Sequence, residues 1–250
     1  MNGLEPEEPA QQAVILAAGL GSRLSGHLVP KPLRPVLGIT LLERTIHSLY
    51  GSGVREIIVV CGYRGAEVAQ VATAVQLPNG TVRCVDNPNW RLANGVSLLA
   101  AQPYLTGRFL VSMSDHLLST GMVRQMAMVK PPDHGAALAT DPRLDQIFDM
   151  DDATKVLADT DGYITDIGKE IPRFDRIDTG LFCCTTGLLE TLRSQYETNG
   201  DCSLSQGVKE LAKQRRMIAC NIGKNDWWQD VDTPAAATHA EQLLREKQQE

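Results

Sequence analysis

A glycine-rich loop with basic residues is the first feature of the sequence that can do chemistry. It lies in LAAGLGSRLSGHLVPKPLRPV, residues 16–36, directly after an apolar run. Gly19 and Gly21 carry no side chains, so backbone N–H groups there can approach phosphate oxygens. Arg23 and Lys31 can neutralise the charge of a phosphate. The loop therefore predicts a site for a phosphorylated ligand.

The charge distribution indicates a small anionic ligand. The 250 residues include 24 Lys and Arg against 30 Asp and Glu, which gives a net charge of −6. An acidic protein binds nucleic acid poorly, so no nucleic-acid partner is expected. No acidic residue lies between Glu8 and Glu43, whereas residues 141–178 hold eleven acids and five bases. A basic patch on an acidic protein favours local capture of a small anion.

Three aspartates are also singled out by their positions. Asp115 follows the apolar run 108–113, so we expect it at the same sheet edge as the glycine loop. Asp230 and Asp232 lie two residues apart in WWQDVDTP, and residues at this spacing share one face of an extended segment. The alternative is structural: Asp115 would be a helix cap or turn residue, and one of the later pair would cap the C-terminal helix.

Alternating strands and helices must position these residues. Capping boxes predict helices that begin after Thr40 and after Ser203, and Thr233-Pro234 predicts the start of a C-terminal helix. Residues 13–130 alternate between the two kinds of element, which predicts a parallel, doubly wound sheet. We expect strands there at 13–18, 56–61, 81–86 and 108–113, and helices at 40–50, 64–75, 94–101 and 119–130. Later strands, expected with fewer helices and therefore as antiparallel edge strands and a lid, are 135–140, 154–158, 163–167, 178–185 and 217–222.

The composition predicts one cytoplasmic globular domain. Apolar residues make up 43% of the chain, but no apolar run approaches the roughly 20 residues that a membrane span needs. Residues 1–12 are expected to be a flexible tail, and residues 13–250 a single domain. The six cysteines, which include Cys183 and Cys184, show no CxxC or zinc spacing, so we expect reduced, mostly buried thiols.

Three phosphate-binding motifs compete for the glycine loop. The dinucleotide fingerprint GxGxxG requires glycine where the sequence has Leu24, which disfavours a Rossmann dehydrogenase, and the P-loop pattern is absent. The third pattern, GxGxR followed by PKP, is present as residues 19–23 and 30–32. With the preceding LAAG, these residues resemble the nucleotidyltransferase (pyrophosphorylase) family, which makes nucleoside-diphosphate sugars and CDP-alcohols.

The resemblance implies a doubly wound, mostly parallel α/β sheet of the Rossmann-like, nucleotidyltransferase type A kind, with an antiparallel lid or edge region in the second half. It divides the domain into a nucleotide-binding half (13–130), an acceptor-binding half (131–234) and a C-terminal helix (235–250). Joining two phosphates requires in-line positioning and charge neutralisation, with no covalent step on the protein. The resemblance therefore implies Arg23 and Lys31 as catalytic cations, and Mg²⁺ held by Asp115 with either Asp230 or Asp232.

Further motifs resemble the cytidylyltransferases of this family that act on inositol 1-phosphate. They are NPNW (87–90), NGVS (94–97), SMSDH (112–116), DATKV (152–156), IGK (167–169) and DTGLF (178–182). The resemblance covers residues 13–240. It implies that Lys169, as a third catalytic cation, binds the acceptor phosphate, with Asp178, Thr179 and Gly180 beside it. The nucleotide site that it implies consists of Leu16, Ala17, Ala18, Gly19, Gly21, Asn94, Gly95 and Ser97.

The expected function is Mg²⁺-dependent conversion of CTP and inositol 1-phosphate into CDP-inositol and pyrophosphate, by in-line attack of the acceptor phosphate on the α-phosphate. The expected partners are CTP and a phosphorylated polyol, with a separate membrane CDP-alcohol phosphotransferase downstream. Two alternatives remain: the same chemistry on phosphocholine or a sugar 1-phosphate, and a non-catalytic nucleotide-sensing homologue. The inositol stereoisomer, the strictness for CTP over UTP and the oligomeric state, with a homodimer as one option, stay open.

Overall fold

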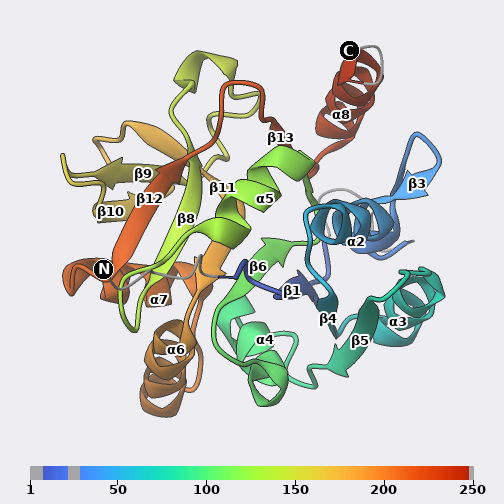
Figure 1. Ribbon diagram of the computed structural model, residues 1–250, viewed down its shortest axis with the longest axis horizontal. Coiled ribbons are helices and arrows are strands. Elements are labelled where there is room, and N and C mark those ends of the chain that lie inside the picture. The colour runs from blue at the N-terminus through green and yellow to red at the C-terminus, as the bar shows by residue number, and fades with distance from the viewer. Residues whose placement is uncertain (1–7, 22–28, 248–250) are drawn as a thin grey trace, which may run out of the picture.

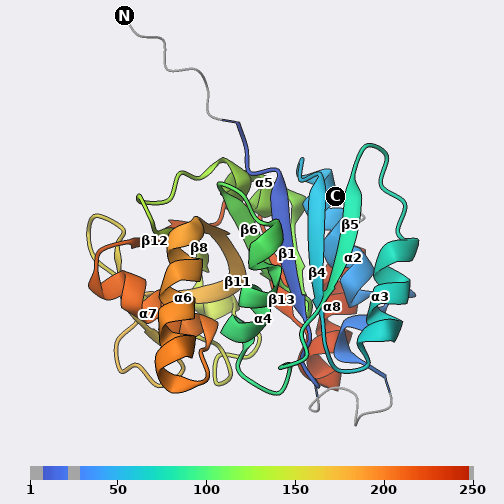
Figure 2. The same cartoon turned by 90° about the horizontal axis from the view of Figure 1, so that it is seen from below.

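A parallel sheet forms the first half of the domain, as the alternating pattern predicts. The computed structural model describes residues 8–21 and 29–247. Four parallel strands lie in the spatial order β6-β1-β4-β5, side by side in Figure 2. Their bounds are β1 Gln12–Ala17, β4 Glu56–Cys61, β5 Thr81–Asp86 and β6 Phe109–Met113. The helices that connect or follow them are α2 Leu41–Gly51, α3 Gly65–Ala74, α4 Asn94–Ala101 and α5 Thr120–Met128.

The second half extends this sheet with mostly antiparallel strands, which confirms the expected edge region. In the described part of the chain the sheet has nine strands, and β11 joins the two halves by pairing antiparallel with β6. β11 also pairs antiparallel with β8 and β9, whereas β12 is parallel to β8. The bounds are β8 Ala136–Asp141, β9 Lys155–Ala158, β10 Ile164–Gly168, β11 Arg176–Cys184 and β12 Met217–Asn221.

Helices cover both faces of the sheet, so the fold is doubly wound. Alternate side chains of β1 point to opposite faces: Val14 and Leu16 belong to one core, and Ala13, Ile15 and Ala17 to the other. Helices α4, α6 and α7 contribute to the first core, and α2, α3 and α5 to the second. Figure 1 shows α4 and α6 below the sheet and α2 and α5 above it. A strand buried on both faces reads as a continuous apolar run, which is the pattern that predicts β1.

One long helix was not predicted from the sequence. Helix α6 covers Thr186–Asn199 and is followed by α7, Leu204–Lys213. The Thr185 side chain caps its start, and Gly200 ends it in the left-handed conformation with φ 72°. Leu188, Leu189 and Leu192 are its buried positions. The threonine cap, the terminal glycine and this leucine spacing are helix signals that the sequence did contain.

Several short elements and one long helix complete the edge of the sheet at which β1 and β6 end. They are η1 Lys31–Leu33, β2 Pro35–Val36, β3 Ile39–Thr40, β7 His116–Leu118, β13 Trp228–Asp230 and the terminal helix α8 Pro234–Lys247. A third, smaller core joins α8 to this region through Val36, Leu41, Leu117 and Leu244. Two further 3₁₀ helices are η2 Gln102–Tyr104 and η3 Leu144–Gln146.

Residues 10–12 of the expected flexible tail belong to the folded domain. Ala10 is buried and its N–H donates to the carbonyl of Ala127 over 2.8 Å, and β1 begins at Gln12. Residues 1–7 of the expected tail lie outside the described residues. Within the described residues, no helix has the length and apolar character needed to cross a bilayer. All six cysteines are free, and Cys183 and Cys184 are buried as expected.

Candidate active site

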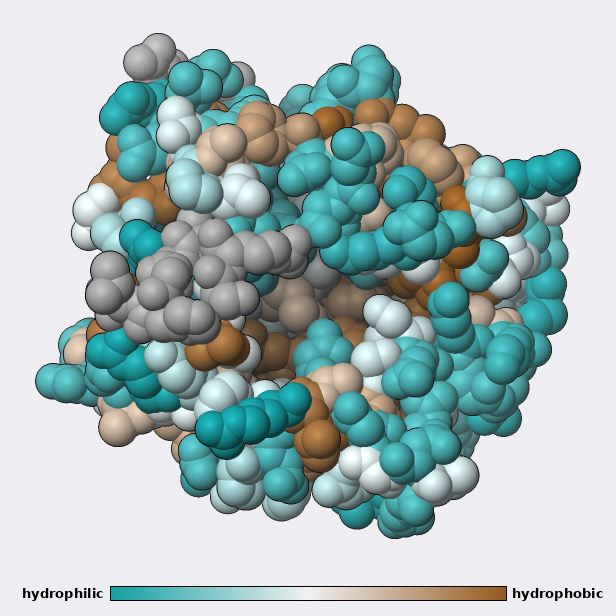
Figure 3. Space-filling model, turned by 180° about the vertical axis from the view of Figure 1, so that it is seen from behind, coloured by the Kyte–Doolittle hydropathy of each residue, from teal (hydrophilic) through white to brown (hydrophobic). Residues whose placement is uncertain are grey.

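A cavity of about 700 Å³ opens where β1 and β6 end, and residues from both halves of the chain line it. Gly19, Gly21 and Asp115 lie on the wall from the first half, and Lys169 and Asp178 on the wall from the second. Figure 3 shows the side of the molecule that faces away from the viewer in Figure 1. This side is hollowed near its middle, and both polar and apolar residues lie in the hollow. The structure therefore brings Gly19 and Gly21, the three aspartates and Lys169 to one site, as their positions in the sequence predict.

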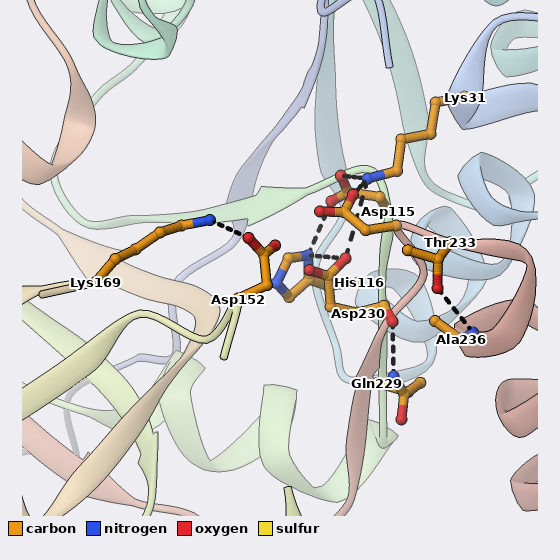
Figure 4. Close-up of polar contacts among 10 residues, drawn as sticks. Lys31, Asp115, His116, Asp152, Lys169, Gln229, Asp230, Thr233 and Ala236 are labelled. Atoms are coloured by element: carbon orange, nitrogen blue, oxygen red, sulfur yellow. Dashed lines mark hydrogen bonds and ion pairs between the residues drawn. The ribbon is translucent and has the colours of Figure 1, made fainter. Parts of the chain in front are cut away.

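Lys31 and the three aspartates form the centre of this site. The Lys31 ammonium is ion-paired with Asp115 and Asp232, and its Nζ lies 4.0 Å from Oδ1 of Asp230. Figure 4 shows the Lys31 side chain reaching in toward Asp115 and Asp230. Only 9% of the Lys31 side chain is exposed, so the carboxylates balance a buried charge. The cluster brings together one cation and three carboxylates from three segments that are far apart in sequence.

Two local features position this cluster. Strands β7 and β13 pair antiparallel, which sets Asp230 opposite His116 in the residue register, and the N–H of Val231 donates to the carbonyl of Asp115 over 3.0 Å. On the other side, Gly21 has φ +61°, and a Cβ atom there would collide with the Lys31 side chain. Glycine at this position thus allows the loop to pack directly against Lys31.

His116 joins the cluster although the sequence analysis did not assign it a role. Its Nδ1 lies 2.8 Å from Oδ1 of Asp115 and 3.9 Å from Oδ1 of Asp230. Its ring stacks on Trp228, with the centroids 6.0 Å apart and the planes 9° apart. Burial opposes protonation of the ring, but the charges of Asp230 and Asp115 prevail and raise the pKa of His116 to about 9. The imidazole is therefore, after Lys31, a second cation of this cluster at neutral pH.

The pKa values of Asp115 and Asp230 shift in opposite directions, although both carboxyls are buried. Burial alone would raise the pKa of Asp115, but the Lys31 charge and the His116 contacts hold it well below its usual range. Asp230 has no such close partner, so burial and the charge of Asp115 raise its pKa, although His116 opposes the change. The site thus holds one firmly ionised carboxylate beside one whose negative charge is only partly compensated, by Lys31 and His116 at 4.0 and 3.9 Å.

The incompletely compensated charge of Asp230 suits binding of a divalent cation. Oδ1 of Asp230 is buried and has no hydrogen-bond partner among the described residues. Two groups of side chains have ligand atoms within 4.8 Å of one another: Asp115, His116 and Asp230, and separately Asp152, Asp230 and Asp232. Carboxylate oxygens are the ligands that Mg²⁺ prefers. The carboxylates present therefore suit Mg²⁺. Both Asp230 and Asp232 lie close enough to other candidate ligands to serve as the second carboxylate.

Lys169 lies across the cavity from this cluster. Its Nζ lies 2.5 Å from Oδ1 of Asp152, and its carbonyl accepts a hydrogen bond of 2.8 Å from Nζ of Lys155. Asp152 belongs to the segment between β8 and β9, and Lys169 follows β10. The acceptor-side lysine is thus held through its backbone, and its ammonium group faces a partly exposed carboxylate.

The neighbouring strand β11 contributes the other residues expected on the acceptor side. Burial raises the pKa of Asp178 to about 6, although the N–H of Gly180 donates to its Oδ1 over 2.7 Å and His116 also favours the charged form. Gly180 has φ +75°, and a Cβ there would lie 2.7 Å from Cδ2 of His116. Thr179 points away into the sheet, where its hydroxyl donates to the carbonyl of Ala139 over 2.8 Å. Asp178 and Gly180 line the cavity, whereas fully buried Thr179 holds the strand in place.

The residues expected to bind the nucleotide fall into two groups. Leu16, Gly19, Gly21 and Asn94 line the cavity. Asn94 is the first residue of α4, and its Oδ1 accepts a hydrogen bond of 2.8 Å from the N–H of Leu204. Arg23 lies outside the described residues, so its expected catalytic role stays a prediction.

The second group supports this wall from behind. Gly95 packs so closely that a Cβ would lie 2.7 Å from the carbonyl oxygen of Cys202, and the Ser97 hydroxyl accepts a hydrogen bond of 2.9 Å from Nδ2 of Asn87. Ala17 and Ala18 are buried, and the Ala18 carbonyl accepts from the N–H of Tyr63 over 3.0 Å. These contacts of Gly95 and Ser97 hold α4 in place, and their expected part in the nucleotide site stays a prediction.

Four side chains of the site had no assigned role in the sequence analysis: His116, Asp141, Asp152 and Trp228. The buried carboxylate of Asp141, at the end of β8, accepts hydrogen bonds from Nε1 of Trp228 over 3.0 Å and from Nη2 of Arg143 over 2.8 Å. Trp228 in turn stacks on His116, so Asp141 supports the cluster indirectly, by holding the Trp228 ring in place. Both His116 and Asp152 lie in motifs that carry the resemblance, SMSDH and DATKV, and this was the signal for them.

A glycine loop after the first strand, a lysine among carboxylates and a second lysine across the cavity define a nucleotidyltransferase site. The family model of the MobA-like NTP transferase domain matches residues 13–162, and the chain belongs to this family.

Two curated relatives with the same name are similar to nearly the whole of this chain. The chain is 40% identical over 236 residues to the "bifunctional IPC transferase and DIPP synthase" of Rubrobacter xylanophilus, covering 93% of this chain and 51% of the relative. It is 34% identical over 235 residues to the protein of the same name from Thermococcus kodakarensis, covering 94% of this chain and 50% of the relative. The chain thus spans about half the length of these curated relatives.

Two solved structures share the fold of this chain over nearly its whole length. The inositol-1-phosphate CTP transferase of T. maritima superposes with a TM-score of 0.81 at 26% identity and covers 96% of both chains. A UDP-glucose pyrophosphorylase complexed with UDP-glucose superposes with a TM-score of 0.79 at 16% identity, covering 95% of this chain and 99% of that one, which shows the shared fold.

Proposed function

We propose that this domain is an Mg²⁺-dependent cytidylyltransferase that converts CTP and inositol 1-phosphate into CDP-inositol and pyrophosphate. The observation that carries the proposal is that Lys31 with its carboxylates and Lys169 face each other across one cavity. The names of the bifunctional relatives and of the T. maritima transferase support the choice of CTP and inositol phosphate.

The reaction is a displacement at phosphorus. An oxygen of the acceptor phosphate forms a bond to the α-phosphorus of CTP, and the bond from that phosphorus to the bridging oxygen breaks, so pyrophosphate leaves with the electron pair. A phosphate monoester is already largely ionised near neutral pH, since its second pKa is about 6. No general base is therefore required, and the protein has to align the groups and neutralise their charge.

The residues divide this work between the two sides of the cavity. Lys31, together with Arg23, would neutralise the triphosphate, and Asp115 with Asp230 or Asp232 would hold Mg²⁺. When bound, Mg²⁺ supplies positive charge to the phosphates of the nucleotide. Lys169 would hold the acceptor phosphate in line with the α-phosphorus.

Recognition of the two organic groups would use the remaining cavity residues. Leu16, Gly19, Gly21 and Asn94 lie on one wall, where we propose that CTP binds, with Ala17, Ala18, Gly95 and Ser97 shaping that wall from behind. Asp178 lies on the other wall, and a carboxylate suits the hydroxyl groups of a polyol. We further expect a membrane CDP-alcohol phosphotransferase to use the product, and a homodimer stays a prediction.

The test is pyrophosphate release from CTP and Mg²⁺ over a panel of acceptors. The panel contains both enantiomers of inositol 1-phosphate, phosphocholine, glycerol 3-phosphate and several sugar 1-phosphates. We expect turnover to be confined to an inositol phosphate. Turnover with another acceptor would support the cytidylyl transfer but would show that inositol 1-phosphate is the wrong acceptor. No turnover by folded protein that still binds CTP would favour a nucleotide-sensing homologue.

A further inference from the structure

The ammonium group of Lys169 is held by a carboxylate inside the cavity. Nζ of Lys169 lies 2.5 Å from Oδ1 of Asp152, and their side chains are 48% and 31% exposed. Both residues line the cavity, and they belong to different segments of the acceptor half. A partly exposed ion pair of this kind is weak and exchanges readily with a competing anion. Asp152 can therefore be displaced from Lys169 without disturbing the core.

The same carboxylate also lies next to the cluster around Lys31. Ligand oxygens of Asp152, Asp230 and Asp232 lie within 4.8 Å of one another. Figure 4 shows Asp152 between Lys169 on one side and the ring of His116 on the other. Asp152 thus occupies the space that separates the acceptor-side lysine from the three carboxylates at the centre of the site.

An acceptor phosphate has to occupy this space. It must contact Lys169 on one side and reach the α-phosphorus, bound beside Lys31, on the other. Carboxylate and phosphate oxygens accept the same charge-assisted hydrogen bonds from an ammonium group. In the structure, the carboxylate of Asp152 therefore takes the position at Lys169 that the acceptor phosphate requires.

We propose that Asp152 is a specificity-determining residue that competes with the acceptor phosphate for Lys169. This inference rests on the proposed function, in which Lys169 binds that phosphate. A carboxylate carries one negative charge, whereas a phosphate monoester carries about 1.5 to 2 at neutral pH. A phosphate monoester therefore competes with Asp152 more strongly than a singly charged phosphodiester or a neutral polyol does. The substrate class that the site selects is a dianionic phosphate monoester.

The test is calorimetric binding of inorganic phosphate in the absence of Mg²⁺ and nucleotide. Asp152→Asn should bind phosphate about fivefold more tightly than the wild type, because one partly exposed ion-pair partner is removed. Asp152→Glu keeps the carboxylate and should stay close to the wild type. The matched control is Asp151→Asn, which removes the same charge from the exposed neighbouring residue and should change the affinity less than about twofold. The gain should vanish in the double variant Asp152→Asn/Lys169→Gln.

Kinetics separate this inference from the proposed function. In Asp152→Asn, the KM for inositol 1-phosphate should fall by about the same factor as the phosphate dissociation constant, without a rise in kcat. Wild-type or weaker phosphate affinity in Asp152→Asn, an equal gain in Asp151→Asn, or no phosphate binding by any of the proteins would overturn the inference. If phosphate binding changes as expected but inositol 1-phosphate is not a substrate, the acceptor in the proposed function is wrong and the competition at Lys169 stands.

Discussion

Replacing Asp178 with asparagine should make the protein more stable at neutral pH and leave its stability unchanged in acid. Burial raises the pKa of this carboxyl to about 6 from an ordinary value of 3.8. Asparagine keeps an oxygen that can accept the N–H of Gly180, a hydrogen bond of 2.7 Å in the wild type. The substitution therefore removes the ionisation and preserves the local contact.

The size of the effect follows from proton linkage. Between about pH 4 and pH 6 the folded protein keeps a proton that the unfolded chain has released, so wild-type stability falls as the pH rises. The difference between about 6 and 3.8 corresponds to at most about 3 kcal/mol, at about 1.36 kcal/mol for each tenfold change in proton affinity. The amide side chain of the variant cannot ionise, so the variant does not lose this free energy.

Urea unfolding of both proteins at several pH values measures the difference. We expect Asp178→Asn and the wild type to differ little below about pH 4, and the variant to be more stable by up to about 3 kcal/mol above pH 7. Asp133→Asn, at an exposed aspartate, should show no such trend. A difference between Asp178→Asn and the wild type that is constant across this range would refute the reasoning. If Asp178 binds the acceptor, the stabilised variant should also turn over more slowly.

Three further substitutions test the site. Lys31→Ala should lower turnover by about 100-fold or more while the circular dichroism spectrum stays native, because the cation beside three carboxylates is lost, and near-normal turnover would exclude Lys31 from the mechanism. Asp115→Asn should raise the Mg²⁺ concentration for half-maximal activity by about tenfold or more, and an unaltered Mg²⁺ titration would reject its role as a ligand. Gly180→Ala should lower the free energy of unfolding by about 1–3 kcal/mol, since φ is +75° and the new Cβ would lie 2.7 Å from Cδ2 of His116, and an unchanged urea midpoint would contradict this.

Much of the fold follows from local sequence patterns. The apolar run at β4 and the capping box at Thr40 are confirmed because each is set by neighbouring residues. By contrast, β7 and β13 pair residues 116–118 with residues 228–230, and a three-residue strand has no periodicity of its own. Such elements depend on tertiary contacts, so the sequence does not predict them locally.

The site divides in the same way. That Lys31, Asp115, Asp230 and Lys169 share one cavity follows from sheet-edge positions and from motif resemblance. The pairing of Lys169 with Asp152, 17 residues away, depends on how the second half folds over the cavity. The sequence also did not predict that the Ser97 hydroxyl accepts a hydrogen bond from Asn87, because that contact depends on how α4 packs behind the cavity.

Phosphorus NMR of one reaction tests the central claim most directly. With CTP, Mg²⁺ and inositol 1-phosphate, we expect CDP-inositol and pyrophosphate to appear in equal amounts, because attack at the α-phosphorus must release both. Lys31→Ala should form neither at a comparable rate. CDP with an inositol diphosphate as the products would place the attack of the acceptor at the γ-phosphorus, and CDP with inorganic phosphate would show hydrolysis by water in place of transfer. Unchanged CTP beside folded wild-type protein would show that this site does not catalyse the transfer.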